Sequence, residues 1–359
     1  MTDKRRTKGG NIRHSLSEIL FVVFASVLCG YQDWEMMELF AKEQIEWFRK
    51  YYAYKRGIPS HDTIERLMAS INPKEFNDCL QQWLQSIQQH SKADKLIAID
   101  GKRLKGSYDT GKGQSAIHLL TAYATEQGIC MQQVKTQDKS NEIKAIPELL
   151  NLLSIEDCIV SIDAIGCQKN IAEQIIDKQA DYILAVKRNQ QELYDDIVML
   201  FKHQEPQQTH IKDDKGHGRE ERRICSIMTN LSAIQQHTYN WKHLSTLIKI
   251  ESTRYIKTTQ KQEHAIRYYI SSVQGKTAEQ FNQLIRQHWA IENNLHWNLD
   301  VVFGEDKQRK RTKNMAQNMN LVLKTVMPLL KQSDKKISKN HKRNIAALNS
   351  TFRDELLSF

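Results

Sequence analysis

Short apolar runs that end at a charged residue constrain the fold of this chain most strongly. Residues 96–99 form such a run, which ends at Asp100 and passes into a glycine and a lysine. Its length and its β-branched and aliphatic composition predict a strand buried on both faces of a sheet. Residues 158–162 repeat the pattern and end at Asp163. Because ligand-binding groups gather where such strands end, both aspartates are candidate site residues.

The segments around these two strands alternate between strand and helix patterns. Two alternating runs joined by a turn at Gly128 predict a hairpin. Apolar residues at helical spacing predict two helices, and a further apolar run predicts a third buried strand. The hairpin covers residues 116–124 and 129–134, the helices 140–153 and 170–179, and the strand 182–187. This order predicts an α/β fold: a mixed sheet with helices on its faces.

Residues 1–92 show helical periodicity and form a predicted N-terminal helical domain. Several short helices, with a capped turn near Ser60, are compatible with a DNA-binding module, although a plain packing domain explains them equally simply. The apolar run 19–29 is too short to span a bilayer and lacks a small-residue cleavage site, so it predicts a buried core helix. We therefore expect no membrane association.

The remaining chain divides by composition. Residues 93–190 form the first part of the predicted α/β core, and residues 191–266, polar and alternating, form a predicted β-rich insertion. The core resumes over residues 267–330, which contain a long helix that begins at a capping box formed by Thr277 and Gln280. Residues 331–359 form a basic C-terminal tail, within a longer run of cations that begins near Lys307.

Net charge indicates the class of binding partner, and the cysteine spacing indicates the redox environment. A formal charge of +10 favours a polyanion such as nucleic acid, although a merely soluble basic surface explains it as well. The six cysteines are scattered without a CxxC pair. This spacing argues against a disulfide framework and a zinc site, and it fits a reducing cytosol.

A third carboxylate, Glu292, lies on the long helix among aromatic residues and histidines. Three carboxylates from separate elements suit Mg²⁺, and paired Mg²⁺ ions support phosphodiester chemistry. Other interpretations stay open. Asp163 caps the following helix in the simplest alternative, and Glu292 is then an ordinary surface residue. His288, Glu292 and His296, at i, i+4 and i+8, would instead hold Zn²⁺ or Mn²⁺. Three nearby acids are substitutes for Glu292: Asp300, Glu305 and Asp306.

Four motifs in this order resemble one family, the ISAs-type insertion-sequence transposases, also called H-repeat-associated proteins, of the DDE superfamily. The motifs are Ala98-Ile99-Asp100-Gly101-Lys102, Asp163-Ala164-Ile165-Gly166-Cys167-Gln168, Gly216-His217-Gly218-Arg219, and His288-Trp289-Ala290-Ile291-Glu292-Asn293-Asn294-Leu295-His296-Trp297. The resemblance covers nearly the whole chain. It implies an RNase H-like core, interrupted by a β-rich insertion before the glutamate helix.

The same resemblance implies that Asp100, Asp163 and Glu292 are the catalytic acids and bind two Mg²⁺ ions, which Mn²⁺ can replace. Related transposases carry a Tyr-Arg-Glu-Lys signature around the glutamate. This chain departs from it, with Ile285 and His288 at the Tyr and Arg positions and a leucine at the Lys position, so the DNA contacts of that signature do not carry over. Candidate DNA-binding residues are instead Lys102, Lys187, Arg188, His288, Asn293 and His296.

The function implied is DNA-mediated transposition: hydrolysis at the element ends, then attack of the freed 3′-hydroxyl on target DNA. The partners implied are double-stranded DNA and further copies of the chain, as a homodimer or higher oligomer in a synaptic complex. The location implied is the bacterial cytoplasm, at the nucleoid. Two alternatives remain, an inactive or repurposed DNA-binding protein of the same fold and a nuclease that cuts without joining.

Overall fold

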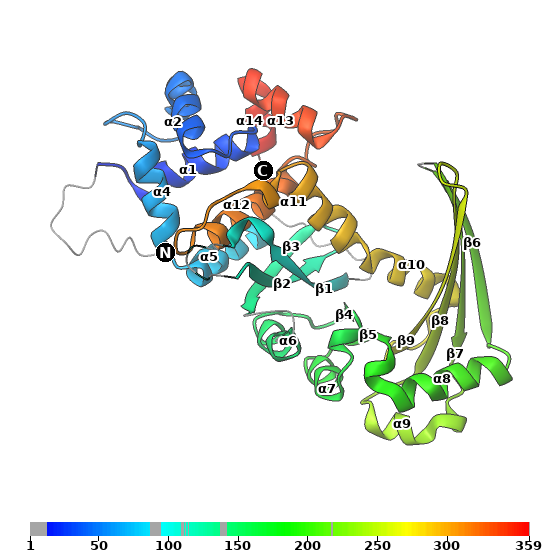
Figure 1. Ribbon diagram of the computed structural model, residues 1–359. Coiled ribbons are helices and arrows are strands. Elements are labelled where there is room, and N and C mark those ends of the chain that lie inside the picture. The colour runs from blue at the N-terminus through cyan, green and yellow to red at the C-terminus, as the bar shows by residue number, and fades with distance from the viewer. Residues whose placement is uncertain are drawn as a thin grey trace. The chain divides into compact units, whose positions relative to one another are not determined.

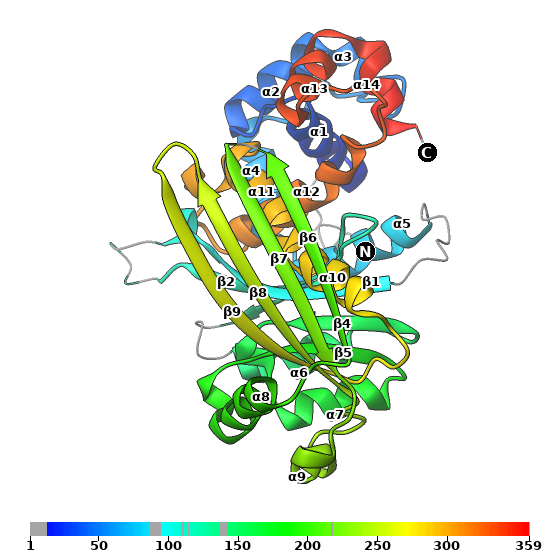
Figure 2. The same cartoon turned by 90° about the vertical axis from the view of Figure 1, so that its right-hand side faces the viewer.

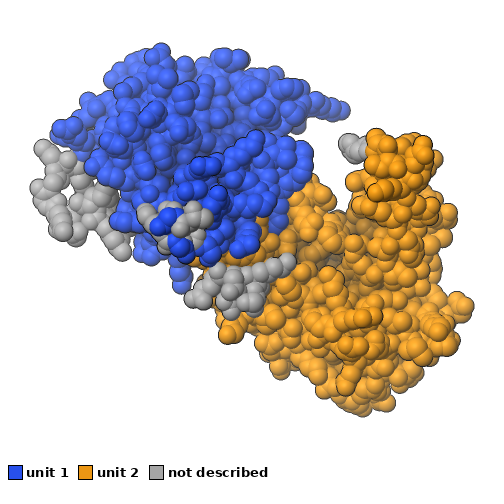
Figure 3. All heavy atoms as spheres, in the orientation of Figure 1, with its two compact units in different colours: residues 1–91, 103–117, 295–359 blue, residues 92–102, 118–294 orange. Residues whose placement is uncertain are grey.

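A computed structural model of the chain describes residues 13–86, 95–108, 111, 113, 115–136, 142–216 and 218–358. His217 and the first two residues of the predicted helix 140–153 lie outside these ranges. The chain forms two compact units (Figure 3), each discontinuous in sequence. Unit 1 comprises Met1–Ser91, Arg103–Ile117 and Leu295–Phe359, and unit 2 comprises Lys92–Lys102 and His118–Asn294. No helix in the described ranges is long and apolar enough to cross a membrane.

Within the described residues, nine strands form one sheet in the order β3-β2-β1-β4-β5-β9-β8-β7-β6. Strands β1, β4 and β5 run parallel, and β2 and β3 form the predicted antiparallel hairpin. This mixed α/β arrangement confirms the predicted RNase H-like fold class. The strands are β1 (Lys95–Leu104), β2 (Ile117–Ala124), β3 (Ile129–Thr136), β4 (Cys158–Ile162), β5 (Asp181–Val186), β6 (Gln208–Gly216), β7 (Arg219–Met228), β8 (Thr246–Ile256) and β9 (Lys261–Ser271).

Helices cover both faces of the sheet in unit 2, as Figure 1 shows. One core cluster joins α6 (Glu142–Asn151), α7 (Lys169–Asp177) and α8 (Gln191–His203) to Ile97 and Ile99 of β1. A second cluster on the opposite face joins α10 (Ala278–His288) to Leu96. Successive residues of a strand point to opposite faces. Every residue of the run before Asp100 is therefore apolar, because each face of the sheet is covered by its own layer of helices.

The segment predicted as a β-rich insertion extends the sheet itself. It begins with α8, continues through the short α9 (Gln235–Asn240), and contributes the long antiparallel strands β6, β7 and β8, visible in Figure 2. Strand β9 crosses the predicted boundary between residues 266 and 267 and pairs with both β8 and β5. Strand periodicity predicts that such strands exist, but it does not identify their pairing partners. The predicted boundary between insertion and core therefore falls inside β9 and not between two elements.

Unit 1 is helical. Its first helix, α1 (Leu16–Leu28), is capped by a Ser15–Glu18 capping box and buries its apolar side completely, which confirms the predicted core helix. The grouping differs from the predicted boundaries, because residues 295–330 belong with the N-terminal helices. The other helices are α2 (Trp34–Glu43), α3 (Ile45–Phe48), α4 (His61–Ser70), α5 (Pro73–Ser86), α11 (Trp297–Val301), α12 (Met315–Leu329), α13 (Lys339–Leu348) and α14 (Ser350–Leu357).

The C-terminal segment is folded, which corrects its prediction as a basic tail. Lys342 of α13 is buried and its Nζ donates to the carbonyls of Leu330 and Ser333, at 2.9 and 2.7 Å. The guanidinium of Arg343 donates to the carbonyl of Val27. These cations hold backbone carbonyls inside unit 1 and do not form a solvated charged face. Counting charges along the sequence does not distinguish these two situations.

Candidate active site

Asp100 and Asp163 both follow the last residue pair of the β1–β4 ladder, but only Asp163 ends its strand: β1 continues to Leu104, which corrects the prediction that it ends at Asp100. Strands β1 and β4 are parallel neighbours in which Ile99 pairs with Ile162, so the next residue of each chain segment is an aspartate. Adjacent strands lie about 4.8 Å apart, so this register brings the two carboxylates together. Asp163 caps a short 3-10 turn, η5 (Ala164–Gly166), through a hydrogen bond that its carboxylate accepts from the Ile165 amide at 3.1 Å; it does not cap the following helix α7, whose N-cap is Gln168.

Glu292 reaches the same pocket from a different element. The predicted long helix is interrupted: α10 ends at His288, and Glu292 lies on a π-helical segment, η8 (Ile291–His296). The carbonyl of Trp289 accepts hydrogen bonds from both the backbone amide and the side-chain amide of Asn293, each at 3.0 Å. Such π segments are frequent at functional sites. Glu292 itself is exposed, contrary to the expectation of a mainly solvent-free face.

The three acids line one cavity of about 200 Å³ in unit 2. Its wall also contains apolar side chains from β4, β5 and α10, so the carboxylates face a partly dry space. Basic and aromatic side chains form the rest of the cavity wall. The polar and aromatic lining residues are Asp100, Ser161, Asp163, Lys187, Arg267, Tyr269, His288, Trp289 and Glu292.

Burial and mutual repulsion oppose the ionised form of all three acids. Burial raises the pKa of Asp100 to about 7; a hydrogen bond from the Gly101 backbone opposes this, while the charges of Glu292 and Asp163 add to it. Burial also raises the pKa of Asp163 and of Glu292, against the nearby cations Lys187 and Arg267 respectively. A bound cation would relieve the repulsion that produces these shifts.

The donor set suits Mg²⁺ better than Zn²⁺. Among the described residues, no three His, Cys, Asp or Glu side chains are close enough to enclose an ion as they stand. This holds for Asp100, Asp163 and Glu292 as well as for His288, Glu292 and His296, so the chemistry of the donors decides between the two ions: three carboxylates supply hard oxygen ligands, which Mg²⁺ prefers. Mg²⁺ keeps several waters and needs only one or two carboxylates. Carboxylate oxygens in a shared pocket would therefore hold Mg²⁺ through Asp100, Asp163 and Glu292.

Two further pocket residues were missed by the sequence reasoning. Arg267 at β9 lies with its guanidinium 5.2 Å from the Trp289 ring centroid. Ser161 Oγ lies 2.8 Å from His288 Nδ1. Arg267 is next to the residue that pairs with the last residue of β5, so the β5–β9 pairing brings it to the site. That pairing joins segments some eighty positions apart, and no local pattern indicates it.

The predicted DNA-binding residues are not all brought together. Lys187 is exposed and lines the pocket, and Arg188, also exposed, begins η6 (Arg188–Gln190) outside the lining. Burial lowers the pKa of His288 to about 4, which keeps it neutral at physiological pH and unsuited to pairing with phosphate as a cation. Asn293 is exposed, Lys102 is half-buried on β1, and His296 belongs to unit 1. Their contacts with DNA stay a prediction.

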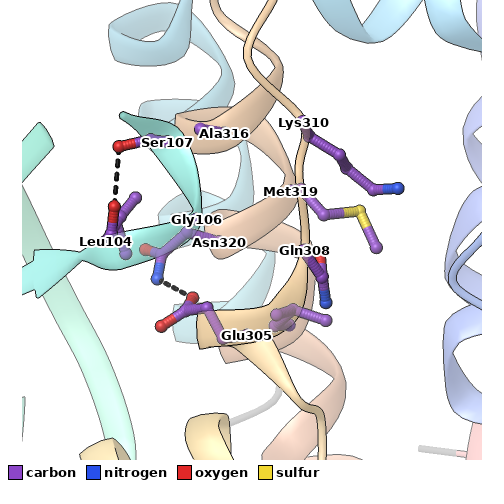
Figure 4. A pocket seen from close by; sticks show the side chains of 10 residues that line it. Leu104, Gly106, Ser107, Glu305, Gln308, Lys310, Ala316, Met319 and Asn320 are labelled. Atoms are coloured by element: carbon purple, nitrogen blue, oxygen red, sulfur yellow. Dashed lines mark hydrogen bonds between the residues drawn. The ribbon is translucent and has the colours of Figure 1, made fainter. Parts of the chain in front are cut away.

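The acids that were substitutes for Glu292 are engaged elsewhere. Asp300, Glu305 and Asp306 all belong to unit 1 and do not line the cavity with Asp100. Figure 4 shows Glu305 pointing toward Asn320, whose amide donates to it at 2.6 Å. Asp306 pairs with Lys105 at 2.7 Å. Glu292 is therefore the acid that shares a cavity with the two aspartates.

The raised pKa of Asp100 predicts a pH dependence of stability in metal-free protein. A carboxyl whose folded-state pKa is raised contributes stability below its unfolded pKa, and that contribution is lost as pH rises towards about 7. Asp100→Asn removes the buried charge and should raise the melting temperature, relative to wild type, more at pH 8 than at pH 5. Thermal unfolding with a chelator measures this, with exposed Asp195→Asn as control. An equal difference at both pH values would contradict it.

Comparisons with known proteins match this chain to transposases. Residues 91–327 match the family described as Transposase DDE domain, and residues 1–84 match the family described as DDE_Tnp_1-associated. YncI of Escherichia coli O157:H7, named as a transposase, is 39% identical, covering 97% of this chain and 90% of the relative. YhhI of Escherichia coli K12, named as an H repeat-associated transposase, is 41% identical, covering 85% and 82%. A solved piggyBac transposase synaptic complex with hairpin DNA aligns with a TM-score of 0.44 and 12% identity, covering 99% of this chain and 76% of that one.

Proposed function

We propose that this chain, which belongs to the family of DDE-domain transposases, cuts DNA at the ends of a mobile element and joins those ends to target DNA. The observation that carries the proposal is the shared cavity. Asp100, Asp163 and Glu292 line it from a strand, a strand end and a π-helical segment. Carboxylates held together against their own repulsion are typical of sites that bind divalent cations.

The proposed cofactor is a pair of Mg²⁺ ions, which Mn²⁺ can replace. When bound, they would activate the attacking oxygen and stabilise the leaving one. The acids hold the cations, and the π-helical segment sets the direction from which Glu292 approaches. The apolar wall and the Trp289 ring limit the access of water to the reacting phosphate.

The cations of the pocket would bind the substrate. Lys187 and Arg267 both line the cavity, and each already faces one of the acids. A scissile phosphate between them and the metal-binding carboxylates is held in line for attack, first by water and then by a 3′-hydroxyl on the target strand. Neutral His288, hydrogen-bonded to Ser161, would support the wall rather than neutralise phosphate charge.

The proposed partners are double-stranded DNA and further copies of the chain. A net charge of +10 favours association with duplex DNA, although part of that charge lies in the buried cations of unit 1. Joining two ends of one element requires both to be held together, which fits a homodimer or higher oligomer in a synaptic complex. The proposed location is the bacterial cytoplasm, at the nucleoid, because the proposed substrate is DNA.

The proposal is tested with labelled duplexes taken from the sequences that flank the gene, together with an unlabelled target plasmid and Mg²⁺. We expect a nick or break at the element end, followed by transfer of label to the plasmid. Cleavage without transfer would favour the alternative of a nuclease on the same fold. Binding without cleavage would favour the inactive or repurposed DNA-binding protein. Omitting Mg²⁺ should abolish both chemical steps, and restoring Mn²⁺ should recover them.

A further inference from the structure

A buried pair of side chains lies directly against the strand that carries Asp100. His118 of β2 and Glu142, the first residue of α6, are 4% and 5% exposed. Their side chains are hydrogen-bonded to each other, His118 Nε2 to Glu142 Oε1. A Cβ added at Gly101 would collide with Glu142 Oε1 and with His118 Nε2. A side chain at residue 101 would therefore displace the Glu142 carboxylate and the His118 ring from their buried positions.

The same helix approaches the loop after Asp163. A Cβ added at Gly166 would lie 3.0 Å from Ile146 Cδ1, in addition to its clash with Ile162. Glu142 and Ile146 are four residues apart on α6 and therefore lie on one face of the helix. The same face of α6 thus contacts Gly101, which follows Asp100, and Gly166, which lies three residues after Asp163. The two glycines allow a closer approach than any other residue would.

The contact at Gly101 bears on the direction of the Asp100 carboxylate. That carboxylate accepts a hydrogen bond from the Gly101 backbone, which is the largest influence opposing its raised pKa. The charge of Glu142 contributes to the raised pKa of both Asp100 and Asp163, which shows that it lies near both groups. A shift of the His118–Glu142 pair would move Gly101, and with it the amide that orients Asp100.

We propose that Glu142, held by His118, is a positioning residue that packs against Gly101 and fixes the orientation of the Asp100 carboxylate, which would hold a metal ion in the cavity. This inference rests on the proposed function, since it concerns the same metal-binding carboxylates. Groups that orient a metal ligand typically contribute 10–100-fold to metal affinity or activity. The role depends on shape and hydrogen bonding, so glutamine at residue 142 should fulfil it and alanine should not.

The test measures Mn²⁺ binding to the full-length protein without DNA, by the loss of the free-ion electron paramagnetic resonance signal. Glu142→Ala should weaken Mn²⁺ binding by about 10-fold or more, whereas Glu142→Gln should stay within a few-fold of wild type. Gly101→Ala should weaken binding as well, and by less in a Glu142→Ala background, because the colliding carboxylate is then absent. Glu148→Gln, an exposed change on the same helix, is the matched control.

Each outcome supports or overturns the inference separately from the proposed function. If wild type and Asp100→Asn bind Mn²⁺ equally poorly, the proposed metal site itself fails. If wild type binds but Glu142→Ala binds equally well, the positioning role is wrong. Equal losses in Glu142→Gln and Glu142→Ala would assign the effect to charge and would also overturn it. Thermal unfolding of each variant identifies any that fail to fold, and the glutamine variant then decides.

Discussion

Replacing Asp100 by asparagine is expected to lower DNA cleavage by at least about 10³-fold, more than the 10–100-fold typical of a residue that only orients a metal ligand. Asparagine keeps the shape of the side chain but removes the charge that would bind the cation. Asp163→Asn and Glu292→Gln should have similar effects, since all three acids line the same cavity. Initial rates of nicking on a labelled end duplex, at saturating Mg²⁺, measure the loss.

DNA binding should survive these changes, because removing a carboxylate lowers repulsion toward the phosphate backbone. Electrophoretic mobility shifts with the same duplex should therefore show equal or tighter binding. Asp195→Asn, an exposed aspartate on α8, serves as the control for the loss of one carboxylate from unit 2. A Glu292→Gln variant that still cleaved at the wild-type rate would remove Glu292 from the proposed site while leaving the two aspartates in place.

Replacing Arg353 by alanine is expected to destabilise unit 1 by at least about 3 kcal/mol, from the cavity and the unpaired acceptors left behind. Arg353 of α14 is fully buried. Its guanidinium carbon lies 5.0 Å from the ring centroid of Phe40 and 4.3 Å from that of Trp47. Its nitrogens donate to the carbonyls of Ala346 and Ala347 and to Gln44 Oε1. One side chain thus joins the last helix to α2 and α3.

Thermal and denaturant unfolding of the full chain measure this loss. Arg353→Lys should recover part of it, because an ammonium keeps the charge but lacks the planar fork that reaches several acceptors at once. Arg309→Ala, at an exposed arginine of unit 1, is the matched control and should change stability by no more than about 0.5 kcal/mol. Wild-type stability in Arg353→Ala would show that the C-terminal helices contribute little to unit 1.

Local pattern was sufficient to locate the two aspartates. Each follows a short run that is apolar, except for Ser161 in the second run, and such a run is buried whichever face it presents. The structure agrees, since Leu96 and Ile97 enter opposite cores and Asp100 and Asp163 follow paired residues. The hairpin and the helices that flank these strands followed from periodicity in the same way. Such features depend on neighbours within a few positions, so sequence alone specifies them.

Glu292 required more than periodicity. Its helical neighbours favoured it, but Asp300, Glu305 and Asp306 stayed open as nearby substitutes, and the family motif singled out Glu292. The structure puts Glu292 in the cavity and engages Glu305 with Asn320. The π-helical segment around it was not predicted, because a bulge of this kind changes hydrogen bonding without changing the apolar spacing that precedes it.

By itself, the sequence determined the alternation of strands and helices, the positions of the two aspartates after buried apolar runs, and membership of a transposase family. Only the tertiary structure decided which distant groups meet: Arg267 at the pocket through the β5–β9 pairing, and Glu142 and His118 against Gly101. It also decided that Arg343 and Arg353 lie inside unit 1 and not in a solvated tail. The reason is physical. Periodicity records which face of an element is buried, whereas the partner on that face is selected by packing between residues far apart in the chain.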